Sequence, residues 1–182
     1  MKSTFVGFGS WFVLPIVLNP SVLRIGLAGQ GDGLRRRLGL LVESAVEPAV
    51  VFAQRIPRAD ELAGLHVLFV AGLDDSASRA LAASARAQGV LVNVEDEPAL
   101  CDFHVPAAVR RGDLLFTVST GGRSPGLSHL LREEIERHFG PEWEARVEEL
   151  ARLRADWRGQ GLDPTDVSER TRTVLNAKGW LG

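Results

Sequence analysis

The sequence feature that most constrains the fold is an apolar run that meets a glycine-rich turn. Residues 22–28 read Val-Leu-Arg-Ile-Gly-Leu-Ala, and residues 29–33 follow as Gly-Gln-Gly-Asp-Gly. Leucines then recur at helical spacing, which predicts a helix over about residues 33–43. A buried strand that turns at glycines into a helix is typical of a parallel βαβ unit, so we expect a core built around a sheet with helices beside it.

The rest of the first half repeats this alternation. Three further short apolar runs predict strands, at residues 49–53, 66–71 and 90–94. An Ala-rich helix, capped by Asp75 or Ser76, is expected to end near Gln88. The pattern predicts an α/β fold with a Rossmann-like, doubly wound parallel sheet over residues 1–105 that is shorter than usual by about one strand.

The pattern after Pro106 is largely helical. A strand is expected at residues 114–119, and Ser124 followed by Pro125 is a strong helix start, because Ser caps the helix and Pro fits its first position. The leucines that follow form one apolar stripe. Two more helices are expected, one after Gly140-Pro141 and one that begins at Asp163-Pro164.

Composition narrows the class of protein. The chain has 182 residues, 45% of them hydrophobic and 24% charged, as in an ordinary globular protein. Its net charge of −2 argues against a general nucleic-acid binder. The single cysteine, Cys101, cannot form an intrachain disulfide, which favours a cytoplasmic protein over a secreted one.

The apolar N-terminal segment, residues 5–18, needs a separate interpretation. Gly7, Gly9 and Pro15 interrupt it, and only Lys2 precedes it, so the segment fits neither a membrane span nor an export signal. We expect an extended segment that packs on the first domain, and no association with a membrane.

The glycine turn is the first candidate binding site. Glycines between a strand and a helix let the backbone approach the phosphates of a nucleotide, which the helix N-terminus then stabilises. The predicted cofactor-binding residues are Gly29, Gln30, Gly31, Asp32 and Gly33. The alternative is a plain tight turn that binds nothing.

Three further observations bear on this prediction. Arg35, Arg36 and Arg37 crowd the first turn of the expected helix, where cations oppose the helix dipole unless an anion lies nearby. The third glycine position of the usual fingerprint is Leu34, and the only acid near the spacing expected for a ribose ligand is Glu47. The cofactor half therefore departs from a complete dinucleotide site.

Two polar stretches follow predicted strands. Residues 93–98 read Asn-Val-Glu-Asp-Glu-Pro at the carboxyl end of a strand, where open α/β sheets bind ligands, and Asp96 in it can act as a general base. A solvated turn is the alternative for residues 93–98.

Residues 119–125 form another polar stretch after a predicted strand. They read Ser-Thr-Gly-Gly-Arg-Ser-Pro and offer hydroxyls and amides at a helix start to a carboxylate or phosphate. The alternative there is a simple strand–helix connection.

Cys101 and His104 have the Cys-x-x-His spacing found in some metal sites. A zinc site needs more ligands than this pair supplies, and the sequence offers no second pair. We therefore expect a small buried thiol, a site-lining or core histidine, and no metal site.

Taken together, these stretches resemble the precorrin-2 dehydrogenase family of siroheme biosynthesis, whose members are also known as siroheme synthase N-terminal domains. The resemblance is strongest over residues 92–107, 110–114, 118–125 and 130–133. Weaker similarity extends back through the glycine turn and forward to about residue 155. The resemblance divides the chain into a Rossmann-like domain, a dimerisation segment of a homodimer, and a C-terminal helical domain, at residues 1–105, 106–140 and 141–182.

The resemblance implies NAD-dependent oxidation of precorrin-2, a polycarboxylate tetrapyrrole, to sirohydrochlorin; some members also insert ferrous iron, a lyase reaction. Asp96 matches the essential carboxylate of the family. The implied substrate-binding residues are Asn93, His104, Ser119, Thr120, Gly121, Gly122 and Arg123. A polyanionic substrate would also give Arg110 and Arg111 a purpose.

Two alternatives remain open at the level of sequence. A degenerate relative would bind or metallate a tetrapyrrole without oxidising it, which the shortened cofactor half favours. A nucleotide-binding regulatory dimer without catalysis would retain the glycine turn but not the chemistry at Asp96.

Overall fold

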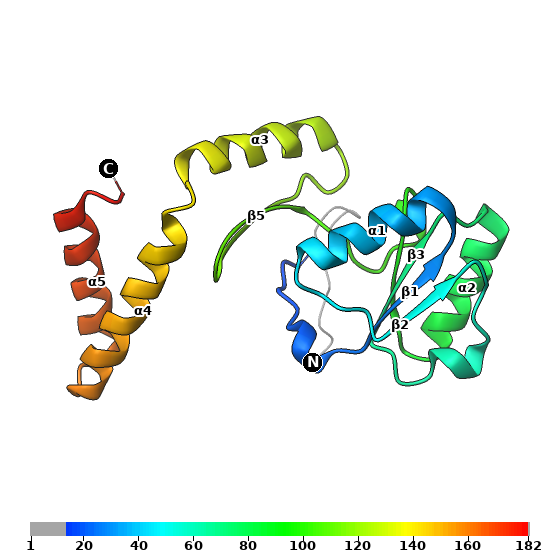
Figure 1. Ribbon diagram of the computed structural model, residues 1–182, viewed down its shortest axis with the longest axis horizontal. Coiled ribbons are helices and arrows are strands. Elements are labelled where there is room, and N and C mark those ends of the chain that lie inside the picture. Colours follow the sequence, from blue (N-terminus) through cyan, green and yellow to red (C-terminus); the bar gives the residue numbers. More distant parts are fainter. Residues whose placement is uncertain (1–13, 182) are drawn as a thin grey trace, which may run out of the picture. The chain divides into compact units, whose positions relative to one another are not determined.

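The computed structural model in Figure 1 describes residues 14–181. The chain divides into two compact units, one ending at Val105 and the other beginning at Pro106. Within the described range, none of the helices combines the length and the apolar character needed to cross a membrane. The prediction for the apolar N-terminal segment falls partly on residues 5–13, outside the described range, and residues 14–18 are exposed rather than packed on the first unit.

The first unit is built on a four-stranded sheet in which all neighbouring strands are parallel. Its strands are β1 (Ile25–Gly29), β2 (Val50–Ala53), β3 (Val67–Ala71) and β4 (Leu91–Val94). They lie in the order β2-β1-β3-β4. The predicted Rossmann-like α/β fold is confirmed.

Two α-helices flank this sheet, α1 (Gly31–Glu43) and α2 (Asp75–Ala87). Helix α1 begins two residues earlier than predicted, so the glycine turn is partly the first turn of the helix. The cap of α2 is Asp74, whose Oδ1 accepts a hydrogen bond from the Ala77 backbone N–H at 2.8 Å. The prediction of Asp75 or Ser76 as the cap was therefore wrong by one or two positions.

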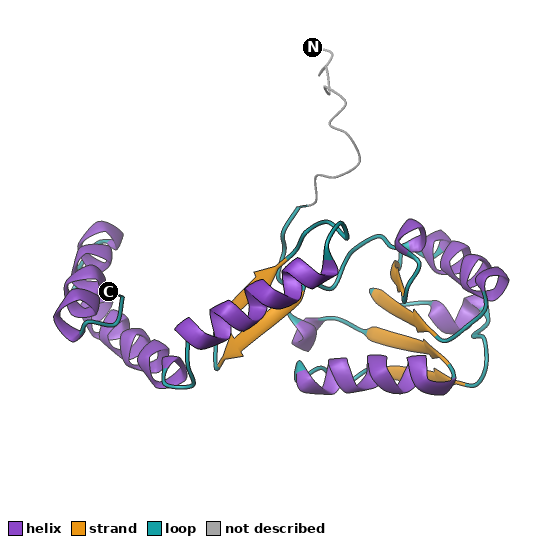
Figure 2. Cartoon of the chain, turned by 90° about the horizontal axis from the view of Figure 1, so that it is seen from above, coloured by secondary structure: helices purple, strands orange, loops and turns teal. Residues whose placement is uncertain are grey.

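Alternating side chains of the strands form two apolar layers, one on each face of the sheet. Leu27 and Phe69 belong to the layer that includes residues of α1, and Ala28 and Val70 belong to the layer that includes residues of α2. Figure 2 shows these helices on opposite sides of the sheet. Burial of each fully enclosed Leu or Val is worth roughly 1.5–3 kcal/mol, so the two layers hold the strand ends firmly in place.

The connection between β2 and β3 is short and contains no α-helix. Helix α1 connects β1 to β2, but the connection from β2 to β3 contains only a short 3-10 helix, η2 (Ala59–Leu62). Among the described strands, β2 lies at the edge of the sheet and pairs only with β1. Two further 3-10 helices, η1 (Pro20–Val22) and η3 (Pro98–Leu100), lie before β1 and after β4.

The second unit begins with an antiparallel hairpin of β5 (Ala107–Arg111) and β6 (Leu114–Val118). Strand β5 was not predicted. The two residues between the strands are Gly112 and Asp113, and Gly112 has φ +56°, a conformation that two-residue hairpin turns require and that glycine adopts without strain.

Three helices follow, α3 (Pro125–His138), α4 (Trp143–Gly159) and α5 (Pro164–Lys178). The predicted cap Ser124 is confirmed, because its Oγ accepts from the Leu127 N–H. The predicted helix start at Asp163-Pro164 is also confirmed, and Asp163 Oδ1 accepts from the Asp166 N–H at 2.9 Å. The unit is held by an aromatic cluster in which Phe139 lies 4.5 Å from Phe116, centroid to centroid. The apolar stripe of α3, by contrast, is exposed.

Candidate cofactor and substrate site

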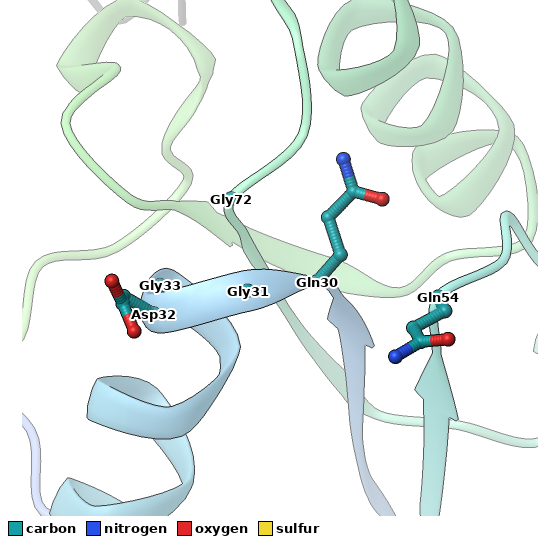
Figure 3. A pocket seen from close by; sticks show the side chains of 6 residues that line it. All are labelled: Gln30, Gly31, Asp32, Gly33, Gln54 and Gly72. Atoms are coloured by element: carbon teal, nitrogen blue, oxygen red, sulfur yellow. The ribbon is translucent and has the colours of Figure 1, made fainter.

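An open hollow of about 470 Å³ lies at the carboxyl ends of β1, β2 and β3 (Figure 3). Its lining residues directly follow those strand ends or start helix α1, and they are Gln30, Gly31, Asp32, Gly33, Gln54 and Gly72. From β1 the chain moves to β2 on one side and then to β3 on the other, so the hollow sits at the topological switch point where such sheets bind ligands. We refer to it as the glycine hollow.

Two glycines allow the close packing beneath this hollow. A Cβ on Gly29 would lie 1.9 Å from the Ala71 carbonyl oxygen, and a Cβ on Gly33 would lie 2.7 Å from the Gly72 nitrogen. Gly33 therefore supplies the close approach between helix and sheet that the third glycine of the usual fingerprint provides. Leu34, which occupies that third position, is partly buried against the core under α1.

Gly31 differs from these two glycines because no atom lies within 4 Å of the position that a Cβ would take. Its φ of +61° turns the backbone toward the hollow without a side chain. The N-cap of α1 is Gln30, whose side chain makes no capping hydrogen bond, so no side chain of the cap satisfies the first amides of the helix. These residues fit an anion such as the pyrophosphate of a dinucleotide.

The three arginines of α1 all have partners within the chain. Arg35 pairs with Asp32, Arg36 Nη2 lies 3.2 Å from Glu95 Oε2, and the Arg37 guanidinium lies 5.2 Å from the centroid of the Phe69 ring. Internal carboxylates account for Arg35 and Arg36, so these two need no external anion. The Nε of Arg37, by contrast, is buried and has no hydrogen-bond partner among the described residues.

A second, smaller hollow of about 230 Å³ lies at the carboxyl ends of β3 and β4. Its lining residues are Arg36, Val70, Ala71, Gly72, Leu73, Asp75, Ser78, Val94, Glu95, Asp96 and Glu97. Four of these are carboxylates, and we call the site the carboxylate hollow. Gly72 lines both hollows, so the two sites are neighbours along one edge of the sheet.

Asp96 occupies an unusual backbone conformation in the turn after β4. The Glu97 N–H donates to the Val94 carbonyl at 3.3 Å, and Asp96, the third residue of this turn, has φ +60°. Turns with a positive φ at the third residue favour Gly or Asn there. The Asp96 side chain is exposed, so the turn presents a carboxylate to solvent at a position where glycine would be less strained.

Side chains from outside the turn hold its base. Asp102 Oδ2 accepts a hydrogen bond from the Val92 N–H at 2.8 Å, and the Asp102 N–H donates to the Val92 carbonyl at 2.8 Å. Arg86 of α2 donates from Nε to Asp102 Oδ1 at 2.8 Å and from Nη2 to the Leu100 carbonyl at 2.8 Å. We call Arg86 and Asp102 the clamp, because together they fix the segment after the turn against β4.

Cys101 completes the base of the turn. Its Sγ accepts from the Val94 N–H at 3.3 Å and lies 3.2 Å from the Val94 carbonyl and 3.4 Å from the Glu97 carbonyl. Burial raises the pKa of the Cys101 thiol, which keeps it protonated at neutral pH. Among residues 14–181, no group of three or more His, Cys, Asp or Glu side chains is arranged to hold a metal ion.

Asn93 is buried, whereas His104 is exposed at the surface. Asn93 is only 6% exposed, and its Nδ2 donates to the Phe103 carbonyl at 2.9 Å, while its Oδ1 has no hydrogen-bond partner within the described residues. His104 is exposed. Of the two predicted substrate residues of the first unit, only His104 presents its side chain at the surface.

The other predicted substrate residues, Ser119, Thr120, Gly121, Gly122 and Arg123, belong to the second unit. The Thr120 hydroxyl lies 3.1 Å from the Ser124 carbonyl and 3.2 Å from Ser128 Oγ, so it anchors the start of α3. Ser119 and Arg123 are exposed.

Arg111, for which the resemblance suggested a substrate carboxylate, is committed to the second unit itself. Its Nε donates to the Phe139 carbonyl at 2.8 Å, and its Nη1 donates to the Arg110 carbonyl at 2.9 Å. Arg110 itself is exposed. Only Arg110 of this pair therefore presents its side chain at the surface.

Glu47, the acid nearest the spacing expected for a ribose ligand, does not lie at the ligand-binding end of β2. Glu47 precedes β2, whereas ligands bind beyond the carboxyl end of that strand, where Gln54 and Arg55 follow Ala53. The Gln54 N–H donates to the Gly29 carbonyl at 2.8 Å, which sets its side chain into the lining of the glycine hollow. The signal that identifies Gln54 is its place directly after the second strand, not its charge.

Comparison with known proteins matches two family models to the chain. A model described as putative NAD(P)-binding matches residues 16–107, and one described as sirohaem biosynthesis protein central matches residues 111–138. The gap between the two matches falls close to the boundary between the two units, at Val105 and Pro106.

Curated relatives named siroheme synthase share part of their length with this chain. One from Methylococcus capsulatus is 34% identical over 163 residues, 80% of this chain and 34% of that protein. One from Ectopseudomonas mendocina is 41% identical over 124 residues, 59% of this chain and 27% of that protein. The chain spans about a third of the length of the first of them. Among solved structures, "SirC, precorrin-2 dehydrogenase" has the same fold, with a TM-score of 0.72, 15% identity and 93% of both chains covered.

Proposed function

The chain belongs to a family of putative NAD(P)-binding proteins of sirohaem biosynthesis, and from this premise we propose that it is a precorrin-2 dehydrogenase, which oxidises precorrin-2 to sirohydrochlorin with a nicotinamide dinucleotide. The family resemblance favours NAD⁺ as the oxidant. The observation that carries the proposal is the pairing of the glycine hollow with the carboxylate hollow along one edge of the sheet, with Gly72 in both. Such an enzyme would work in the cytoplasm.

The glycine hollow would hold the cofactor. The backbone at Gly31 and the first amides of α1 would face its pyrophosphate, while Gly29 and Gly33 keep the helix close enough to the sheet for those amides to point outward. Gln54 would face the ribose beyond β2. When bound, an oxidised nicotinamide supplies the acceptor for a hydride.

Asp96 would take the proton. Oxidation of precorrin-2 removes a hydride and a proton, and the proton needs a base that solvent and substrate can reach. The Asp96 carboxylate is exposed, lines the carboxylate hollow and stands on a turn fixed by Cys101 and the clamp. A carboxylate held in one place at the substrate is an effective general base.

The substrate-binding residues are also proposals. His104, Ser119 and Arg123 are exposed and offer an imidazole, a hydroxyl and a guanidinium, groups that bind carboxylates. Thr120, Gly121 and Gly122 would shape the loop before α3, in which the Thr120 hydroxyl is already used. Asn93 would act from the interior by holding Phe103 against β4 rather than by touching substrate.

The direct test is an anaerobic absorbance assay of precorrin-2 with NAD⁺, followed for both sirohydrochlorin and NADH. We expect equimolar formation of the two products by the wild type and loss of both in Asp96→Asn. Absence of sirohydrochlorin from the wild type, together with tetrapyrrole binding, would favour a degenerate tetrapyrrole-binding relative. Dinucleotide binding without tetrapyrrole binding would favour a regulatory dimer instead.

Insertion of ferrous iron is a second candidate function, and the carboxylate hollow is the observation that favours it. Four carboxylates line that hollow, and they would attract a divalent cation that is a substrate rather than a resident metal. The test is anaerobic incubation of sirohydrochlorin with Fe²⁺, for which we expect siroheme formation that Asp96→Asn abolishes. Equal rates with and without protein would exclude the activity.

We also propose that the protein is a homodimer through the second unit. Leu127, Leu130 and Leu131 of α3 are 47%, 62% and 42% exposed, a stripe of leucines that a monomer would leave in water. Sedimentation equilibrium should show a dimer for the wild type and a monomer for Leu130→Glu. A monomeric wild type at all concentrations would contradict the proposal.

A further inference from the structure

The end of β2 carries no acidic side chain. In dinucleotide-binding sheets, an Asp or Glu near this point binds the ribose hydroxyls of NAD, and an Arg nearby accommodates the 2′-phosphate of NADP. Here the residue directly after β2 is Gln54, which lines the glycine hollow and has φ +59°. A neutral amide can donate to a hydroxyl or a phosphate, and it repels neither.

The carboxylate that does line the glycine hollow is turned away from Gln54. Asp32 is the acidic member of the lining set, and its side chain pairs with Arg35 one turn along α1. Figure 3 shows the Asp32 carboxylate on the far side of the Gly31 turn from Gln54. It therefore contributes little repulsion to a phosphate placed beside Gln54.

The segment beyond Gln54 balances its charges locally. Arg55 donates from Nη1 and Nη2 to Glu61 at 3.0 and 2.8 Å, and its guanidinium lies 4.9 Å from the centroid of the Phe52 ring. Arg58 pairs with Asp60 in the same way. Both carboxylates are therefore neutralised by direct contact, and no unpaired acid in this segment opposes a phosphate.

The two guanidiniums keep donors for a further acceptor. An Arg side chain has five N–H donors, and Glu61 takes two of those of Arg55. The side chains of Arg55 and Arg58 are 50% and 72% exposed, so a phosphate can reach them from solvent. Bidentate contact with phosphate is a preferred use of such a guanidinium.

We propose that this chain accepts NADP⁺ as well as NAD⁺, with Gln54 and Arg55 admitting the 2′-phosphate. The inference rests on the proposed nicotinamide cofactor and concerns its selectivity. NAD-selective sites use a carboxylate to repel the extra phosphate, and the residue directly after β2 supplies no such carboxylate. We expect the two dissociation constants to lie within about threefold of each other.

Isothermal titration of the full chain with NAD⁺ and NADP⁺, without tetrapyrrole, tests the proposal. Gln54→Asp should weaken NADP⁺ binding relative to NAD⁺ binding by about tenfold or more, as expected for an introduced charge repulsion. Arg55→Ala should weaken only NADP⁺. The matched control is Arg172→Ala, which removes an exposed arginine of α5 in the second unit and should change neither affinity. Circular dichroism of each variant checks that it is folded.

The outcomes separate this inference from the proposed function. Binding of NAD⁺ with no detectable binding of NADP⁺ overturns the inference and leaves the dehydrogenase proposal standing. Binding of both with no effect of Gln54→Asp overturns the role of Gln54. Failure of the wild type to bind either dinucleotide overturns the inference and the nicotinamide cofactor together.

Discussion

The two hollows at the carboxyl edge of the sheet are built in opposite ways. The glycine hollow is formed by backbone, with Gly29 and Gly33 packed so closely that neither tolerates a Cβ. The carboxylate hollow is formed by side chains, with Asp96 displayed on a turn that Cys101 and the clamp hold from behind. One site depends on the absence of side chains and the other on their presence.

This difference predicts which changes each site tolerates. The glycine hollow should lose binding when any side chain is added, whatever its chemistry. The carboxylate hollow should lose catalytic activity when one functional group is changed, even if the shape of the hollow is kept.

The largest expected effect is at Asp96. Asp96→Gly should reduce turnover by on the order of 100-fold or more, because the general base is lost. Glycine also suits the positive φ of this residue, so the free energy of unfolding should stay the same or rise by up to about 1 kcal/mol. Steady-state rates and urea denaturation check the two parts. A destabilised Asp96→Gly that retains turnover would mean that Asp96 is only a structural turn residue.

The second prediction contrasts two glycines of the same hollow. Gly33→Ala should destabilise the fold by about 1–3 kcal/mol, since the added Cβ would meet the Gly72 backbone at 2.7 Å. Gly31→Ala should cost only about 1 kcal/mol, because its Cβ enters open space and only the left-handed backbone is strained. Thermal unfolding measures the difference, and equal losses of stability in the two variants would refute the packing argument.

The third prediction concerns the clamp. Asp102→Ala removes the acceptor of the Val92 N–H and of Arg86, and hydrogen bonds to a charged group are each worth about 1.5–3 kcal/mol. We expect the free energy of unfolding to fall by at least about 1.5–3 kcal/mol. Turnover should also fall because the turn that carries Asp96 loosens, whereas dinucleotide affinity should stay unchanged. Asp102→Asn, which keeps an acceptor for Val92, is the matched control. A parallel loss of dinucleotide affinity would show that the two hollows are not independent.

The smallest expected effect is a pH dependence at the end of β2. Hydrogen bonds from Arg55 lower the pKa of Glu61 from 4.5 to about 2. A carboxyl whose pKa is lower in the folded state stabilises the protein above its unfolded pKa, and that stabilisation is lost as the pH falls toward its folded pKa. The melting temperature of Glu61→Gln should therefore lie below that of the wild type at pH 7, with the gap narrowing as the pH falls from about 4.5 toward 2. A difference in melting temperature of the same size at pH 7 and at pH 3 would contradict the ion pair.

The sequence predicted the elements whose signals are local. The buried strands follow from short apolar runs, and Ser124 with Pro125 marks a helix start that the structure reproduces. The position of Asp96 beside a ligand-binding edge followed from its place after a strand. These features depend on a few neighbouring residues, so they are visible without tertiary information.

The sequence did not predict features that arise from contact between distant segments. Strand β5 is Ala-Ala-Val-Arg-Arg, which has no clear alternation and becomes a strand by pairing with β6. The role of Gly33 depends on Gly72, which lies far along the chain. Gln54 was not predicted, because a neutral side chain after β2 does not match the acid that the usual fingerprint places there.

The most direct test of the account compares Gly31→Ala with Asp96→Asn in one set of measurements, the dissociation constant of the dinucleotide and the turnover of precorrin-2 at saturating dinucleotide. The account predicts that Gly31→Ala weakens dinucleotide binding by about tenfold but keeps most of its turnover at saturation. It predicts that Asp96→Asn binds dinucleotide like the wild type and has almost no turnover. If both variants lost affinity and turnover together, or if Asp96→Asn kept its turnover, the division of labour between the two hollows would be wrong.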